Sequence, residues 1–383
     1  MSVPFLDLRA QDAAIGEQVR AAIADVLASQ HFILGARLER FEAAMAAYCG
    51  VPHAIGVGSG TDALALALGA LGVGPGKAVL TTPFTFWATA STIVRLGARP
   101  VFADVDPLTL NLDPDAAGEA LARAGEQVCG IVPVHLFGRL ASMRPLQALA
   151  DRHGCWIVED AAQAIGARAG GVSAGAFGVA GCLSFYPTKN LGGLGDGGMV
   201  VTRDAELAAR VRQERHQGQH APYVHASIGL CSRLDELQAA ALTVKLAHLD
   251  RWNAARRALA DRYTVRLTDA GLAGHPQAPL VLPPPAGEAH VFHQYVMRAR
   301  DRDALRSHLT RSGIGTQVYY PLPLHEQPAL AHLGLRRGAF PEAERAAAEV
   351  LALPIYPELT PAQVDTVVDA IVAHHRDRPR AGR

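Results

Sequence analysis

The sequence lacks the features of membrane-spanning and exported proteins. No stretch approaches the ~18 uninterrupted apolar residues of a membrane helix, and residues 1–9 contain no apolar signal-peptide core. The five cysteines are far apart and form no CxxC pair: Cys49, Cys129, Cys155, Cys182 and Cys231. This pattern is typical of reduced thiols and does not suit a zinc site. We therefore expect a cytoplasmic protein with no membrane contact and no bound metal.

An excess of charge of either sign is also missing. Lys plus Arg and Asp plus Glu each number 36, so the formal net charge at pH 7 is zero. Aromatic residues make up only 6% of the chain and do not interleave with basic ones. Because nucleic-acid binders usually carry a basic face, we expect no nucleic-acid partner. An anionic ligand would have to be bound by a few local groups.

Short apolar runs bounded by Gly, Pro or Asp recur through the first two hundred of the 383 residues. They predict seven strands, at residues 53–57, 78–82, 100–104, 130–134, 156–159, 182–185 and 199–202. Helical patterns lie between most of them, as at 62–71, 88–96 and 143–153. Strands that alternate with helices indicate an α/β fold with a mainly parallel seven-stranded sheet, covered on both faces.

The second part of the chain has a different pattern. One long amphipathic helix is predicted over 233–267, followed by a proline-rich break at 276–285. Further strands are predicted at 294–298 and 317–320, and further helices at 302–312 and 361–374. We expect two domains, a large one over residues 1–250 and a smaller C-terminal α+β domain over residues 251–383.

A glycine-dense loop carries the first candidate for chemistry. Residues 184–198, SFYPTKNLGGLGDGG, follow a predicted strand and contain Lys189. A lysine that bonds covalently to a carbonyl compound must first lose its proton, which burial favours. A surface lysine on a flexible loop is the alternative. The chain has only two other lysines, Lys77 in a turn and Lys245 on the long helix, and we expect both to be solvated.

A carboxylate follows another predicted strand, in the motif IVEDAAQ at 157–163. Asp160 would point into the same crevice as the lysine loop. In pyridoxal-phosphate (PLP) chemistry a carboxylate keeps the pyridine nitrogen protonated, so that the ring withdraws electrons from the substrate. Gln163 could donate to the phenolate oxygen of the ring. An aspartate that caps the following helix is the alternative.

Two further motifs suit the same cofactor. GVGSGTDAL at 56–64 opens a helix with backbone N–H groups and hydroxyls that could bind a phosphate, including those of Gly60 and Thr61. It lacks the lysine of a P-loop and the spacing of a dinucleotide fingerprint. TPFTFWAT at 82–89 places Phe86 at a strand-to-helix junction, where an aromatic ring could stack on a planar cofactor. A simple helix cap and a core aromatic are the alternatives.

Taken in order, six motifs resemble those of the DegT-type nucleotide-sugar aminotransferases, which have PLP fold type I. They are GSGTDAL (58–64), FTF (84–86), EDAAQ (159–163), SF (184–185) with Lys189, SRLDELQAA (232–240) and PLPLH (321–325) with Gln327. The resemblance covers essentially the whole chain. It implies a large domain with a seven-stranded sheet, a small C-terminal domain, and pyridoxal 5'-phosphate as the cofactor.

The resemblance also implies roles for single residues. Lys189 would hold the cofactor covalently and move the proton during the reaction, while Asp160 would pair with the ring nitrogen. Gln163 would contact the phenolate oxygen, and Phe86 would stack on the ring. The cofactor phosphate would be bound by Gly60, Thr61 and Ser184.

The family is dimeric, and the segment before Ser232 reaches into the partner's site. The family usually has Asn at the position of Cys231, and its amide binds the phosphate of the neighbouring subunit's cofactor. A thiol is a weak donor, so its presence there would cost ~1–2 kcal/mol of cofactor affinity. We expect a homodimer with shared active sites, with Cys231 beside the phosphate.

The implied function is transfer of an amino group from L-glutamate to a keto-sugar nucleotide, as in amino-sugar and polysaccharide biosynthesis. The YPLPLH form of the last motif favours a 3-keto dTDP- or UDP-hexose as the substrate. Tyr319, Tyr320 and His325 would lie on the sugar side of the site, and His216 is a further candidate. One family branch has His in place of the lysine and removes oxygen instead, and Lys189 argues against that reaction.

Two alternatives stay open. One is a PLP enzyme of the same fold that acts on amino acids, since such enzymes commonly bind the substrate carboxylate with an arginine of the small domain. Arg298, Arg336 and Arg337 are candidates for that role. The other is a non-catalytic scaffold or regulatory protein, which the presence of Asp160 and Lys189 disfavours.

Overall fold

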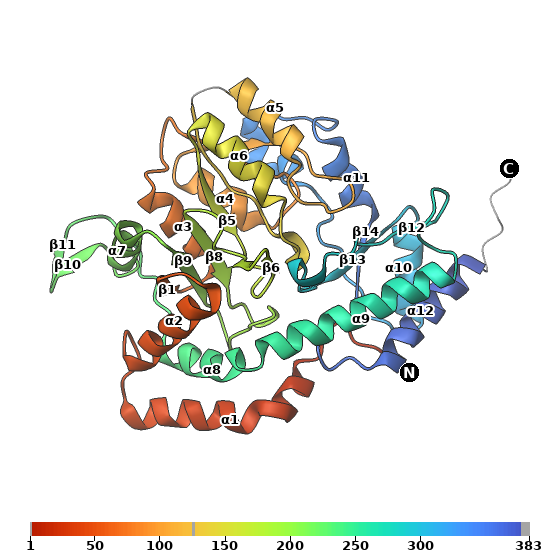
Figure 1. The fold of residues 1–383 in the computed structure, drawn as a ribbon, viewed down its shortest axis with the longest axis horizontal. Helices are drawn as coiled ribbons and strands as arrows, with labels where there is room; N and C mark the ends of the chain where they lie inside the picture. The colour runs from red at the N-terminus through yellow and green to blue at the C-terminus, as the bar shows by residue number, and fades with distance from the viewer. Residues whose placement is uncertain (1, 125–126, 377–383) are drawn as a thin grey trace.

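The computed structural model describes residues 2–124 and 127–376, and its larger part is built on one seven-stranded sheet (Figure 1). The strand order is β1-β9-β8-β5-β4-β2-β3. Strands β8, β5, β4, β2 and β3 pair in parallel, whereas β9 is antiparallel to both β1 and β8. The bounds are β1 His53–Val57, β2 Ala78–Thr81, β3 Arg99–Phe102, β4 Val128–Ile131, β5 Trp156–Asp160, β8 Ala180–Ser184 and β9 Gly198–Thr202. The predicted α/β fold with a mainly parallel sheet is confirmed.

Helices cover both faces of this sheet because its strands are apolar on both sides. In β9, Val200 packs with α3, α4 and α7, while Met199 and Val201 pack with α2 and α8 on the opposite face. Helices α5 and α6 cover that second face farther along, beside β2 and β4. The bounds are α2 Ala36–Cys49, α3 Gly60–Ala70, α4 Trp87–Arg95, α5 Pro114–Ala124, α6 Met143–His153, α7 Ala205–Glu214 and α8 Glu236–Leu246.

The predicted single helix over 233–267 was wrong, because the chain forms two helices there. Helix α8 ends at Leu246, and α9 (Leu249–Asp269) begins after His248. Helix α8 packs beside α1 (Leu8–Ser29), whereas α9 packs beside α12 (Pro361–Arg376). The amphipathic pattern that predicted one helix therefore runs through two helices that pack against different partners.

Lys245 also differs from its prediction. It lies in the last turn of α8 and is buried, and its Nζ donates to the carbonyl of Gly192 at 2.7 Å. The ammonium group of Lys245 therefore anchors the glycine-rich loop and is not solvated. Lys77 is exposed, as predicted.

The C-terminal part is a second, smaller core around an antiparallel sheet of β12 (Leu280–Val281), β13 (Tyr295–Ala299) and β14 (Val350–Leu353). Helices α9, α10 (Arg302–Arg311) and α12 pack on it, and Val3 from the N-terminus joins this core. The predicted strand at 317–320 was wrong. Only Gln317 pairs there, with Ala352 of β14, which takes the sheet position beside β13.

The remaining elements are short or peripheral. They are α11 (Pro341–Glu349), the hairpins β6 (Arg168–Ala169) with β7 (Val172–Ser173) and β10 (Gln219–Ala221) with β11 (Val224–His225), and the 3-10 turns η2 (Leu136–Gly138), η3 (Gly287–Ala289), η4 (Leu324–Glu326) and η5 (Pro328–Leu333). Among the helices of residues 2–124 and 127–376, none is both long and apolar enough to cross a membrane. Figure 1 shows the β10–β11 hairpin projecting at one end of the molecule and α10 and α12 at the other.

Candidate active site

A cleft of about 520 Å³ lies beside the carboxyl ends of β5 and β8 and the start of α3. Loops after parallel strands are the usual place for ligands in such sheets. The predicted site residues that line it are Gly60, Thr61, Phe86, Asp160, Gln163, Ser184, Lys189, Tyr319 and Tyr320. One cavity thus brings together segments up to 260 positions apart in the sequence.

The start of α3 forms one wall of the cleft. Ser59 caps the helix, since its Oγ accepts the N–H of Asp62 at 3.0 Å. A Cβ at Gly60 would lie only 2.7 Å from the Cβ of Ser184, so glycine is required for the helix to start this close to the end of β8. The helix dipole and the backbone N–H groups at its start favour an anion here.

Asp160 ends β5 and faces the cleft with a carboxylate that is nearly buried. Burial raises the pKa of this carboxyl, whereas hydrogen bonds from Thr89 and Ala162 act in the opposite direction. The Thr89 hydroxyl donates to Oδ2 at 2.7 Å, and the Ala162 N–H donates to Oδ1 at 3.3 Å. Thr89 was not predicted as a site residue, although it lies four positions after Thr85 and the two hydroxyls are 3.2 Å apart.

Lys189 extends into the cleft from the glycine-rich loop. Burial lowers the pKa of its amine to about 8, and the nearby charge of Asp160 opposes this shift. The loop is fixed on two sides. Lys245 binds the carbonyl of Gly192, and Asn190 Nδ2 donates to Asn253 at 2.7 Å and to the Val291 carbonyl at 3.1 Å. The amine therefore starts much closer to its neutral, nucleophilic form than a solvated lysine.

Gln163 is held in place by both ends of its amide. Its Oε1 accepts the N–H of Phe137 at 2.6 Å, and its Nε2 donates to the Tyr320 hydroxyl at 3.1 Å. The Tyr320 ring lies 6.3 Å from that of Phe86, which is 55% exposed at the mouth of the cleft. A planar ligand could therefore contact the Phe86 ring while Gln163 faces its edge.

His293 also lines the cleft, and it was not among the site residues predicted from the sequence. It is buried, and burial together with the positive charges of Lys189 and Arg256 lowers the pKa of the imidazole well below its usual range. A neutral ring at this position adds no positive charge to the site. It lies just before β13 in the C-terminal part, and only the fold brings it to this cleft.

Three predicted site residues do not line this cleft within one chain. Cys231 is exposed, and its Sγ accepts a hydrogen bond from Arg233 Nη2 at 2.9 Å. Nη1 of the same arginine lies 3.1 Å from His216 Nδ1. His325 is buried elsewhere, where its Nε2 contacts Glu344 at 3.0 Å and its ring packs against Phe340. Their roles stay predictions.

The sequence matches the DegT/DnrJ/EryC1/StrS aminotransferase family over residues 13–372. The chain belongs to this family. The predicted family is therefore confirmed, and with it the aminotransferase class.

Relatives of this aminotransferase match it over nearly their full lengths. A protein from Geobacillus stearothermophilus named "pleiotropic regulatory protein" is 48% identical over 98% of this chain and 99% of its own. The dTDP-3-amino-3,4,6-trideoxy-alpha-D-glucose transaminase of Streptomyces venezuelae is 46% identical over 96% of this chain and 95% of its own.

Solved structures of similar proteins agree with the fold. The crystal structure of S. venezuelae DesV in complex with a ketimine intermediate has a TM-score of 0.93 and 46% identity, covering 99% of both chains. The structure of NtdA from Bacillus subtilis with bound cofactor PMP has a TM-score of 0.90 and 30% identity, covering 98% of this chain and 86% of its own. The predicted PLP fold type I is therefore confirmed.

Proposed function

We propose that this aminotransferase uses PLP to convert a 3-keto dTDP- or UDP-hexose into the amino sugar, with L-glutamate as the amino donor. The predictions of a PLP-dependent enzyme and of conversion of keto sugars to amino sugars are confirmed by the family and by the named relatives. The observation that carries the proposal is the cleft itself, because Lys189, Asp160 and Gln163 line one cavity beside a helix start that favours an anion.

The residues of the cleft fit the cofactor. The phosphate would lie at the start of α3, where Gly60, Thr61 and Ser184 line the cleft. Asp160 would face the ring nitrogen, Gln163 the phenolate oxygen, and Phe86 the ring face. Bound PLP supplies the electron sink that makes a proton on the substrate carbon acidic.

The chain's own residues would do the rest. With a pKa of about 8, Lys189 can carry a proton in one step and return it in the next at near-neutral pH. Asp160 would keep a proton on the ring nitrogen, and the Thr89 hydroxyl holds the Asp160 carboxylate through its Oδ2. The Tyr320 hydroxyl orients the amide of Gln163.

A sugar substrate fits the cleft better than a simple amino acid as the acceptor. None of the arginines in the described residues lines the cleft. Arg298 lines a different, much smaller cavity, and Arg336 and Arg337 are exposed. Tyr319 and Tyr320 instead offer hydroxyls and ring faces, which suit a hexose. The named transaminase from S. venezuelae acts on a 3-amino sugar nucleotide, which agrees with reaction at C3.

A homodimer with shared sites is part of the proposal. The segment that ends at Cys231 includes exposed apolar side chains, with Tyr223 95% and Ile228 100% exposed, which a second copy would cover. The cleft itself contains little positive charge for a sugar diphosphate, so Arg233 of a second copy would supply that positive charge.

In a dimer with Cys231 beside the cofactor phosphate of the second copy, Cys231→Asn should tighten cofactor binding about fivefold, for a gain of about 1 kcal/mol. An unchanged affinity would argue against a phosphate contact. A cytoplasmic location stays a prediction.

Product analysis tests the function. The purified chain is incubated with PLP, L-glutamate and a panel of dTDP- and UDP-linked 3-keto and 4-keto hexoses, and amino-sugar nucleotides are measured by mass spectrometry. We expect product from a 3-keto substrate, with 2-oxoglutarate formed in equal amount. Transfer to 2-oxo acids alone would favour an amino-acid enzyme, and no transfer to any acceptor would favour a regulatory protein.

A further inference from the structure

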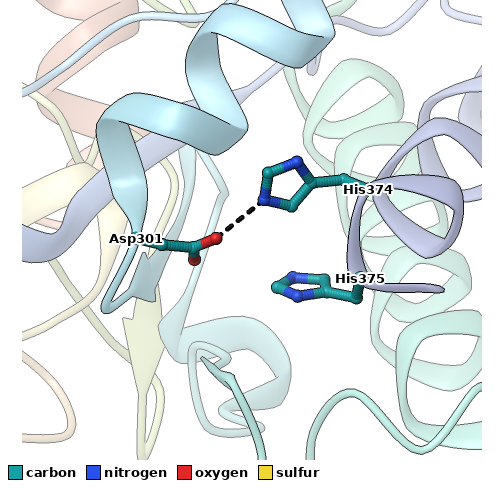
Figure 2. Close-up of side chains that lie close together, drawn as sticks. All are labelled: Asp301, His374 and His375. Carbon is teal, nitrogen blue, oxygen red and sulfur yellow. Dashed lines mark hydrogen bonds and ion pairs between the residues drawn. The ribbon is translucent and has the colours of Figure 1, made fainter. Parts of the chain in front are cut away.

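Three side chains far from the cleft converge in the C-terminal part. Asp301 lies just before α10, and His374 and His375 lie in the last turn of α12. Their possible ligand atoms all lie within 4.8 Å of one another, and His374 Nε2 is 2.7 Å from Asp301 Oδ2. Figure 2 shows both imidazole rings on the side of α12 that faces the Asp301 carboxylate.

We propose that Asp301, His374 and His375 bind a divalent transition-metal ion of the zinc class. Two imidazoles and one carboxylate form a ligand set that Zn²⁺ and its neighbours in the transition series favour. The end of α12 adds the negative pole of a helix, which also favours a cation. His374 is 8% exposed, so one ligand is already largely shielded from water.

The three residues are neighbours, but their ligand atoms, which lie within 4.8 Å of one another, would have to move to form a metal site. With metal–ligand distances of about 2.0–2.1 Å, tetrahedral ligands lie about 3.3 Å apart. His374 and Asp301 would therefore separate by about half an ångström, and the metal ion would replace the proton that they share. With three protein ligands, a tetrahedral ion would take its fourth ligand from water.

A metal ion at this position would connect the start of α10 to the end of α12. Both helices pack on the smaller core, so the ion would stabilise that core without touching the cleft. The expectation of no bound metal rested on the spacing of the cysteines. The ligands proposed here are histidines and an aspartate that lie 73 positions apart in the sequence and meet only in the fold.

Zinc titration of the cofactor-loaded chain tests this proposal. After treatment with EDTA and desalting, ZnCl₂ is added in a calorimeter, and the thermal unfolding midpoint (Tm) is measured with and without zinc. We expect one saturable site and a rise in Tm of about 3 °C or more. Co²⁺ bound in the same place should give the visible absorption of a nitrogen- and oxygen-ligated ion.

Variants identify the ligands. His375→Ala keeps the Asp301–His374 contact, so the chain should fold, but zinc should bind at least about tenfold more weakly and the rise in Tm should disappear. His153→Ala is the matched control, because this exposed histidine lies in the last turn of α6. The absence of a saturable site, or equal zinc affinity of the unaltered chain, His375→Ala and Asp301→Asn, would overturn the proposal.

Discussion

The pKa of Lys189 leads to a quantitative prediction about cofactor loading. Only the neutral amine can react with PLP, so the loading rate should rise with pH until the amine is mostly deprotonated. With the pKa lowered from 10.5 to about 8, this rise should level off a little above pH 8. At pH 7 about one tenth of the amine is then neutral, roughly 300 times the fraction for a solvated lysine.

Stopped-flow absorbance of the cofactor-free chain mixed with PLP, between pH 6 and pH 10, measures this dependence. N-acetyl-lysine is the solvated control, and its rate should keep rising toward pH 10. Asp160→Asn removes the negative charge that raises the pKa of Lys189, so its plateau should begin at lower pH. A rate that rises tenfold per pH unit up to pH 10, or a plateau that moves upward in Asp160→Asn, would refute this reasoning.

Three further predictions concern single contacts. Gly60→Ala places a Cβ 2.7 Å from the Cβ of Ser184 and should weaken cofactor binding at least about tenfold in an absorbance titration. Gly69→Ala in the same helix is the control, because its Cβ meets only contacts of 3.7 Å or more and should leave the affinity unchanged. Equal effects of the two variants would contradict the proposed phosphate site. Thr89→Val removes the hydroxyl that donates to the buried Asp160 carboxylate and should lower kcat about tenfold without loss of folding. Thr92→Val is the control, because it loses only hydrogen bonds to backbone carbonyls and should keep normal activity. Glu236 accepts the N–H groups of Gly35, Arg37 and Leu38 at the start of α2, two of them on Oε1 and one on Oε2. Glu236→Gln has only one acceptor oxygen, so at least one of these N–H groups loses its partner and the free energy of unfolding in urea should fall by about 2 kcal/mol. An unchanged midpoint would be inconsistent with this role of Glu236.

The large sheet could be predicted because most of its strands are short apolar runs buried on both faces, whereas the edge strand β3 is exposed at Arg99. The predicted strands match the seven observed ones to within a few residues. Helix boundaries were harder where one apolar pattern continues through a break. Nothing in the composition of residues 245–250 marks the change of partner from α1 to α12 that separates α8 from α9.

The site was predictable where a residue type is required by the chemistry, as for Lys189 and Asp160. It was not predictable where a residue acts through another one, as Thr89 does on Asp160 and Lys245 does on the loop. His293 enters the cleft from the C-terminal part. These contacts depend on the packing of separate elements, and that packing leaves no local signal in the sequence.

The most direct test of the central claim is the first half-reaction, followed by absorbance. Purified protein loaded with PLP should show a visible absorption band that disappears on addition of L-glutamate and returns on addition of a 3-keto-sugar nucleotide. Lys189→Ala should show neither the protein-bound band nor its disappearance. A band that glutamate leaves unchanged in the native chain, or an identical response in Lys189→Ala, would contradict the assignment of Lys189 and of the donor.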